Sequence, residues 1–221
     1  GYAARGFRLS ARGGIVLRGG LRLREHLDFG DLSQVAALGR AAYRFQPAPG
    51  FGAPWIEVAA AAEILRHRDS GLRDGSLISG TMSIGKHLTD RIRVVAGLGR
   101  DEREGSDGAL YDLSTSRAWL GLDYRAGVKT TLYGNAGWLQ GDHVFTASYP
   151  GAQNWLSPYS DVIAADPAFN DAFGGVPTTA YRLEAKTVTL EIGLNIPVTG
   201  TQAFDIGASW FESEADAGKG S

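Results

Sequence analysis

The sequence predicts an all-β protein, a closed antiparallel transmembrane β-barrel of about ten strands, within a range of about 8–12. Three observations lead to this prediction. Apolar and polar residues alternate with a period of two along most of the chain, as in strands whose faces meet different environments. No apolar run approaches the roughly 18 residues of a membrane-spanning helix. Short and long connections also take turns between the alternating segments, with short periplasmic turns and longer extracellular loops expected.

Composition narrows the possible classes of protein. The formal net charge of -2 gives no basis for a nucleic-acid partner, and the absence of cysteine excludes disulfides and thiolate metal sites. The 31 glycines are scattered through apolar segments and do not form a linker. The length suits a single β-barrel domain over residues 1–221. Because arginines interrupt every apolar run in residues 1–20, we expect no signal peptide there and a chain that starts as mature protein.

The alternation begins in two short segments. Residues 7–17 place apolar or small side chains at every second position, and the pattern resumes over 21–26. A three-residue hairpin loop at 18–20 would pair Leu17 with Leu21 and keep both on one face of a sheet. One long strand preserves the same alternation, and both alternatives remain open.

Eight further segments repeat the pattern. They span 34–45, 54–67, 77–86, 91–101, 111–125, 129–140, 187–196 and 203–210. Most approach the roughly 9–11 residues that a tilted membrane strand needs. Residues 55–68 contain four consecutive alanines and would suit a helix by propensity. We interpret them as a strand because Glu57 and Glu63 share one parity and both flanking segments are strands.

The connections divide into two groups. The longer ones follow every second segment, at about 26–33, 68–76, 102–110 and 141–180. The others are mostly tight turns, near 18–20, 46–53, 87–90, 126–128 and 197–202. We expect the stretch at about 141–179 to be a long extracellular loop and the site of any external recognition, with a short helical turn over 162–165.

Aromatic residues near segment ends predict girdles at the two lipid–water interfaces, where amphipathic rings favour the headgroup level. The expected interface aromatics are Tyr43, Phe45, Trp55, Tyr124, Trp138, Phe204 and Trp210. Packing in the core of a soluble β-protein is the alternative, but positions near strand ends favour the girdles.

In these features the chain resembles the outer-membrane β-barrel superfamily of Gram-negative bacteria over nearly its whole length, without matching a specific family. The resemblance implies a location in the bacterial outer membrane and contact with the lipid bilayer and lipopolysaccharide, and it implies no activity. Such barrels usually begin and end on the periplasmic side, whereas strand counting here places both termini on the loop side. Either a terminal strand is missing or the first segment closes a rearranged chain.

If the apolar parity faces lipid, the opposite parity lines a lumen in which arginine predominates. The expected lumen residues are Arg8, Arg12, Arg22, Arg24, Arg40, Arg44, Glu57, Glu63, Arg91, Arg93, Arg117, Asp123, Arg125, Glu191 and Asp205. In a narrow barrel, guanidinium–carboxylate networks would plug the interior. A narrow pore that favours a small anionic solute is the alternative.

No constellation of catalytic residues rises above chance, so we expect no catalytic residues, no metal ligands and no cofactor. The pairs His26 with Asp28 or Asp31 and His67 with Asp69 are loop-side neighbours only. Asp142 and His143 would point to opposite faces of a strand. Acidic residues such as Glu102 and Glu104 are expected to be solvated charge, with bridging to lipopolysaccharide through cations as a weaker idea.

The function expected from the sequence is a small pore or a membrane scaffold with an arginine-rich lumen. The alternative is the translocator or anchor barrel of a larger secreted or surface protein, and an enzyme with its site at the barrel rim ranks third. A soluble all-β barrel is the rival at the level of fold, and it should need no detergent.

Overall fold

The alternating segments form one antiparallel sheet in the computed structural model, which describes residues 1–27, 30–106, 109–127, 130–148, 151–166, 175–198 and 203–215. The sheet contains 11 strands, of which β9 is only three residues long. The strands are β1 (Tyr2–Arg8), β2 (Gly13–Arg24), β3 (Gln34–Phe45), β4 (Trp55–His67), β5 (Gly75–His87), β6 (Ile92–Gly105), β7 (Leu113–Arg125), β8 (Thr131–Ala147), β9 (Ile163–Ala165), β10 (Thr179–Pro197) and β11 (Ala203–Ala215). This confirms the all-β antiparallel prediction, including the strand at 55–67.

Short helical segments complete the described fold. They are the 3-10 helices η1 (Gly30–Leu32), η2 (Gly71–Arg73) and η3 (Ala109–Tyr111), and the α-helix α1 (Ala152–Leu156). None of the helices in the described part of the chain has the length and apolar character needed to span a bilayer.

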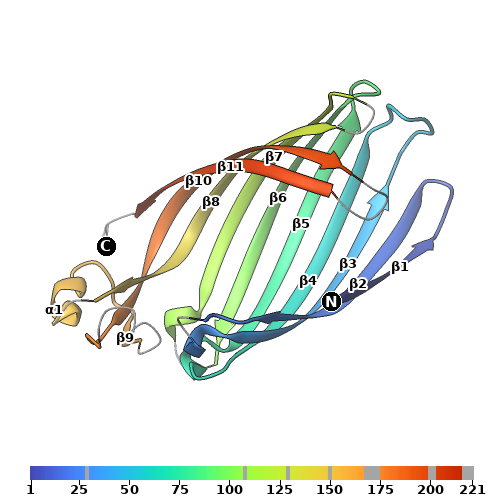
Figure 1. Ribbon diagram of the computed structural model, residues 1–221. Helices are drawn as coiled ribbons and strands as arrows, with labels where there is room; N and C mark the ends of the chain where they lie inside the picture. Colours follow the sequence, from blue (N-terminus) through green and yellow to red (C-terminus); the bar gives the residue numbers. More distant parts are fainter. Residues whose placement is uncertain are drawn as a thin grey trace.

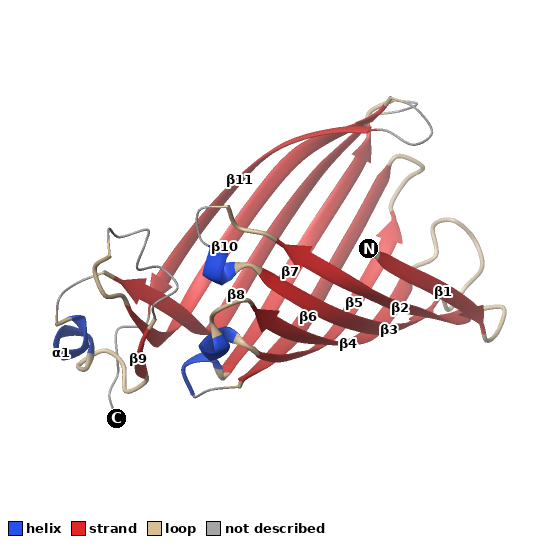
Figure 2. Ribbon diagram, turned by 60° about the horizontal axis from the view of Figure 1, so that its bottom comes forward, coloured by secondary structure: helices blue, strands red, loops and turns tan. Residues whose placement is uncertain are grey.

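The long strands follow one another across the sheet in chain order, from β1 to β8 and then to β10 and β11. Figure 1 shows the sheet strongly curled, with β1 and β11 at its two edges. No ladder joins β1 to β11 within the described residues, so the sheet is open along this seam. The helical segments and β9 gather at one end of the strands, here called the loop end (Figure 2), and the shorter connections lie at the opposite turn end.

The alternation of connections holds with one exception. The loop-end connections cover 25–33, 68–74, 106–112 and 148–178, and the turn-end connections cover 9–12, 46–54, 88–91, 126–130 and 198–202. The exception is 46–54, which is as long as 25–33.

Of the two alternatives for the first segments, the hairpin loop at 18–20 is wrong, and one continuous strand holds only over Gly13–Arg24. β2 runs without a break through Gly19 and Gly20, and the chain reverses at 9–12 instead. Neither glycine has a positive φ, so neither forms a turn. A Cβ on Gly20 would lie 2.6 Å from the Gly1 carbonyl oxygen, which indicates that this glycine permits close approach of two strands.

The expected helical turn over 162–165 is also wrong, because Ile163–Ala165 forms β9. β11 pairs with β10 only from Ala185 onward, which leaves the edge of β10 free at 179–181. β9 pairs with those three residues and supplies their missing backbone partners.

Three loop-end connections share one local design, a 3-10 helix followed by a polar residue. The side chain of that residue accepts a hydrogen bond from a backbone N–H where the preceding strand ends, seven residues earlier. The donor and acceptor residues are His26 and Ser33 (3.1 Å), His67 and Asp74 (2.6 Å), and Gly105 and Asp112 (2.8 Å). Each bond fixes its loop to the strand that enters it.

The two faces of the sheet differ in chemistry. One face carries large apolar side chains that remain exposed, such as Ile78 (61%), Leu98 (66%) and Ile192 (68%). The opposite, concave face carries the ion pairs. Soluble monomers rarely expose apolar patches beyond a few hundred Å². The exposed apolar face is therefore unusual for a protein surrounded by water.

The apolar face ends sharply toward the loop end. Polar residues on the same face lie opposite one another across the ladders of β6, β7, β8 and β10. They are Arg100, Ser116, Gln140 and Lys186. The face is therefore a band with a polar border.

Aromatic rings on the concave face lie flat against glycines of the adjacent strand. Trp119 covers Gly97, Trp55 covers Gly85 and Tyr133 covers Gly193, in each case leaving no room for a Cβ. The glycines therefore permit close contact between each ring and the adjacent strand.

We expect Gly97→Ala to lower the free energy of unfolding by about 1–3 kcal/mol, because its methyl group would overlap the Trp119 indole. Chemical denaturation measures the loss. Gly80→Ala is the matched control, since a Cβ there meets nothing within 4 Å. Equal losses in both variants would show that the ring contact is not the cause.

Candidate functional site

Most of the expected lumen residues share the concave face. By ladder parity this face carries Arg8, Arg22, Arg24, Arg40, Arg44, Glu57, Glu63, Arg93, Arg117, Asp123, Arg125, Glu191 and Asp205. Arg12 and Arg91 lie in turn-end connections and not in strands. Arg18 joins this face although the expected lumen set omits it, since a hairpin at 18–20 would have placed it in a loop.

Ion pairs link strands across this face, between adjacent strands except for Arg22–Glu63, which reaches from β2 over β3 to β4. The guanidinium–carboxylate pairs are Arg22–Glu63, Arg40–Glu57 (2.7 Å), Arg44–Glu57 (2.8 Å), Arg93–Asp123 and Arg117–Asp101 (3.4 Å). No carboxylate pairs with Arg8, Arg18, Arg24 or Arg125 among the described residues. Some of the arginines are thus neutralised, and others leave positive charge on the wall.

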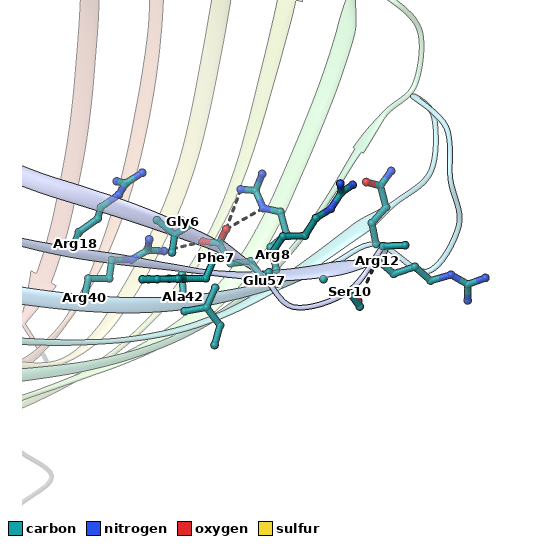
Figure 3. Close-up of a pocket in the computed structure, with 16 residues that line it drawn as sticks. Gly6, Phe7, Arg8, Ser10, Arg12, Arg18, Arg40, Ala42 and Glu57 are labelled. Carbon is teal, nitrogen blue, oxygen red and sulfur yellow. Dashed lines mark hydrogen bonds and ion pairs between the residues drawn. The ribbon is translucent and has the colours of Figure 1, made fainter.

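The unpaired charge is densest in a hollow of about 840 Å³ over β1, β2 and β3 (Figure 3). Five arginines and one carboxylate line it, namely Arg8, Arg12, Arg18, Arg40, Arg44 and Glu57. Figure 3 shows Arg12 pointing away from Glu57, beyond the turn. We call this hollow the arginine hollow.

The ladder register arranges these arginines in two rows. Arg18 lies directly opposite Arg40. Nearer the turn end, Arg8 and Arg44 both lie opposite Gly14, one on each side of it. The floor between the rows is made of small or short residues, Gly6, Val16 and Ala42.

Glu57 fixes two of the arginines. Its carboxylate accepts hydrogen bonds from Arg40 Nη2 at 2.7 Å and from Arg44 Nη2 at 2.8 Å. The Arg44 guanidinium also lies 4.3 Å from the centre of the Trp55 ring. One carboxylate cannot neutralise all the guanidinium groups around it, so the hollow keeps a positive charge.

A second hollow, of about 470 Å³, shares Arg40 with the first. Arg117, Thr81 and Thr189 also line it. Arg40 of β3 and Arg117 of β7 therefore border one common hollow.

The far edge of the face is less basic. Tyr133 Oη donates to Asp205 at 2.6 Å, and Asn195 donates to the same carboxylate at 3.1 Å. Asn135 donates to Glu191 at 2.9 Å. Neutral donors satisfy these carboxylates, so they take no arginine from the basic side.

The expected interface aromatics follow the apolar face with one correction. Tyr43, Tyr124, Trp138, Phe204 and Trp210 are exposed on that face, and Phe45 shares its parity. Trp55 instead lies on the concave face, where it packs on Gly85 and beneath Arg44. The correction follows from parity, because Trp55 is two residues from Glu57.

A second polar cluster fixes the 148–178 connection at the loop end. Asp166 is fully buried and forms an ion pair with Arg73 of η2, and it accepts a hydrogen bond from Tyr111 Oη at 3.4 Å. The Tyr111 ring lies 5.2 Å from the Arg73 guanidinium and 4.9 Å from that of Arg103. Burial raises the pKa of the Tyr111 hydroxyl above its usual value. These contacts join the 148–178 connection, which follows β8, to η2, which lies between β4 and β5.

Among the described residues the histidines form no catalytic set, and Asp28, one predicted partner of His26, lies outside those residues. His67 Nδ1 lies 3.3 Å from Asp74, whose main contact is the loop hydrogen bond, and Asp69 is not its partner. His143 lies beside Phe145. Within the described residues, no group of three or more metal-ligating side chains gathers.

No family model, curated protein or solved structure matches the chain. Its chemistry is therefore read from the residues alone.

We expect Arg73→Gln to release the 148–178 connection, because removing one partner of a buried ion pair costs about 3–5 kcal/mol. Limited proteolysis within that connection should become faster while the strands remain protected. Arg66→Gln is the control, since the Arg66–Asp74 pair is exposed and 3.5 Å long. Unchanged cleavage in Arg73→Gln would mean that the ion pair does not hold the connection.

Proposed function

We propose that this chain is a bacterial outer-membrane β-barrel whose arginine-rich interior forms a pathway for small anions. The observation that carries the proposal is the pairing of opposite chemistries on one sheet, with apolar side chains exposed on one face and ion pairs on the other. Soluble proteins bury the first and expose the second. A closed barrel in lipid requires the reverse.

The strand directions favour closure. β1 runs toward the turn end and β11 runs away from it, so the two edge strands are antiparallel to each other. Pairing between them would satisfy their free backbone groups, which lipid cannot do. Without the three-residue β9, the described sheet has ten long strands. Even strand numbers are the rule for bacterial barrels of this kind.

The borders of the apolar face support a bilayer as the neighbour. Tyr124 and Phe204 lie near the turn ends of β7 and β11. Trp138 and Trp210 lie where their strands turn polar toward the loop end, before Gln140 and Glu212 respectively. Two aromatic borders around an apolar band suit the two interfaces of a membrane.

We expect Ile192→Arg to reduce folding into lipid vesicles, since arginine near the bilayer midplane costs about 2–4 kcal/mol. Ile192 lies on the apolar face, between Gly134 and Ala208 on the adjacent strands and away from both aromatic borders. Urea titration of the vesicle-inserted protein measures the loss.

Gln140→Arg is the matched control, because Gln140 lies on the same face beyond the band and donates to Glu184 at 3.0 Å. It should cost little. If Ile192→Arg were as stable as the parent chain, or made it soluble without detergent, the apolar face would not contact lipid.

The anion preference rests on the excess of arginine over carboxylate on the concave wall. An arginine-lined passage favours negative solutes, and Arg40 and Arg117 border a common hollow midway along it. The rings of Trp119, Trp55 and Tyr133 on this wall lie against glycines of the adjacent strand.

In planar bilayers we expect the chain to give an anion-selective current, and Arg40→Gln with Arg117→Gln to shift the reversal potential toward no preference. Arg68→Gln at the loop-end boundary should leave that potential unchanged, since Arg68 pairs with Glu25 and not with the wall. Absence of current would indicate a plugged scaffold and would reject the pathway.

A further inference from the structure

We propose that the arginine hollow is a binding site for a multiply charged oxyanion of the phosphate class. The inference deepens the proposed function, since it gives the anion pathway a definite site and ligand chemistry. It rests on the proposed function only in requiring that the concave face be filled with water.

The arginine hollow holds like charges close together. Arg18 and Arg40 are direct cross-strand neighbours, and like charges in that position repel each other. Arg40 is compensated by Glu57 at 2.7 Å, but no carboxylate in the described part of the chain pairs with Arg18. A bound anion between the two guanidinium groups would remove this repulsion.

The shape of the arginine hollow also suits a bound anion. The floor under the arginines consists of Gly6, Val16 and Ala42, which occupy successive strands at one level. A Cβ on Gly6 would have only the Ile15 carbonyl oxygen near it, at 4.0 Å. The middle of the hollow is therefore open, and long arginine side chains from both rows can reach over it.

The arginines of the hollow fall into two groups, one held in place by neighbouring side chains and one without such contacts. Glu57 holds Arg40 and Arg44, and Trp55 supports Arg44 from one side. These two guanidinium groups are pre-positioned. The side chains of Arg8 and Arg18 have no hydrogen-bond or carboxylate partner among the described residues, and they complete the cluster from β1 and β2.

The chemistry of the ligand follows from the donors. Each guanidinium offers a planar pair of N–H groups that matches two oxygens of a phosphate or carboxylate. Several guanidinium groups around one carboxylate favour a ligand with at least two negative charges over chloride. Phosphate and pyrophosphate have this charge and several acceptor oxygens.

The effect of a Glu57 substitution on anion affinity distinguishes a binding site from a structural cluster. Its carboxylate competes with any bound anion for Arg40 and Arg44. Glu57→Gln keeps an acceptor oxygen that can still position Arg40 and Arg44 but removes the competing charge. It should therefore strengthen anion binding, whereas loss of a merely structural residue would weaken it.

Calorimetric titration of the detergent-folded full chain with sodium pyrophosphate tests the site directly, with orthophosphate and chloride as comparison ligands. We expect saturable binding of pyrophosphate, weaker binding of orthophosphate and none of chloride. Arg18→Gln and Arg8→Gln should each lower the affinity about tenfold by removing a charged contact. Gly6→Leu should abolish binding by filling the hollow without changing its charge.

Arg5→Gln is the matched control, because Arg5 lies on the same strand but on the opposite face, over the Phe7 ring at 5.1 Å. Its affinity should equal that of the parent chain. No saturable binding up to about 10 mM pyrophosphate would overturn the site, as would weaker binding in Glu57→Gln or an equal loss in Arg5→Gln.

The two proposals fail separately. An anion-selective current without saturable binding would reject the site and leave the pathway. Saturable binding without any current would reject the pathway and leave the site as a binding pocket of a closed scaffold.

Discussion

Each ladder of long strands keeps one register from end to end, from Tyr2 opposite Gly20 at one edge to Pro197 opposite Ala203 at the other. A single bulge would send every later side chain of its strand to the wrong face. Because none interrupts these ladders in the described strands, the period of two in the sequence becomes two continuous surfaces. The apolar band and the basic wall both depend on this constraint.

The same constraint explains why the basic wall is crowded. Arginines on neighbouring strands cannot avoid one another when register is fixed, as Arg18 and Arg40 illustrate. Glu57 relieves the crowding on β3 only, through Arg40 and Arg44. The resulting surface is partly self-satisfied and partly left with guanidinium groups that no carboxylate among the described residues pairs.

Several features followed from local pattern alone. The strand over 55–67 was predictable despite its alanines, because Glu57 and Glu63 share a parity that a helix would not preserve. The hairpin at 18–20 was not, since Gly19 and Gly20 look like a turn yet serve close strand approach. That error hid Arg18, and alternation through the two glycines was the signal that could have found it.

The sequence by itself determined the strands, their two faces and the excess of arginine on one of them, because side-chain direction in a strand is a local property. The tertiary structure alone decided that Arg8, Arg18 and Arg40 share one hollow, and that Asp166 reaches Arg73. Those contacts join residues far apart in the chain or on different strands. They depend on ladder register and on the curl of the sheet, which no short stretch of sequence encodes.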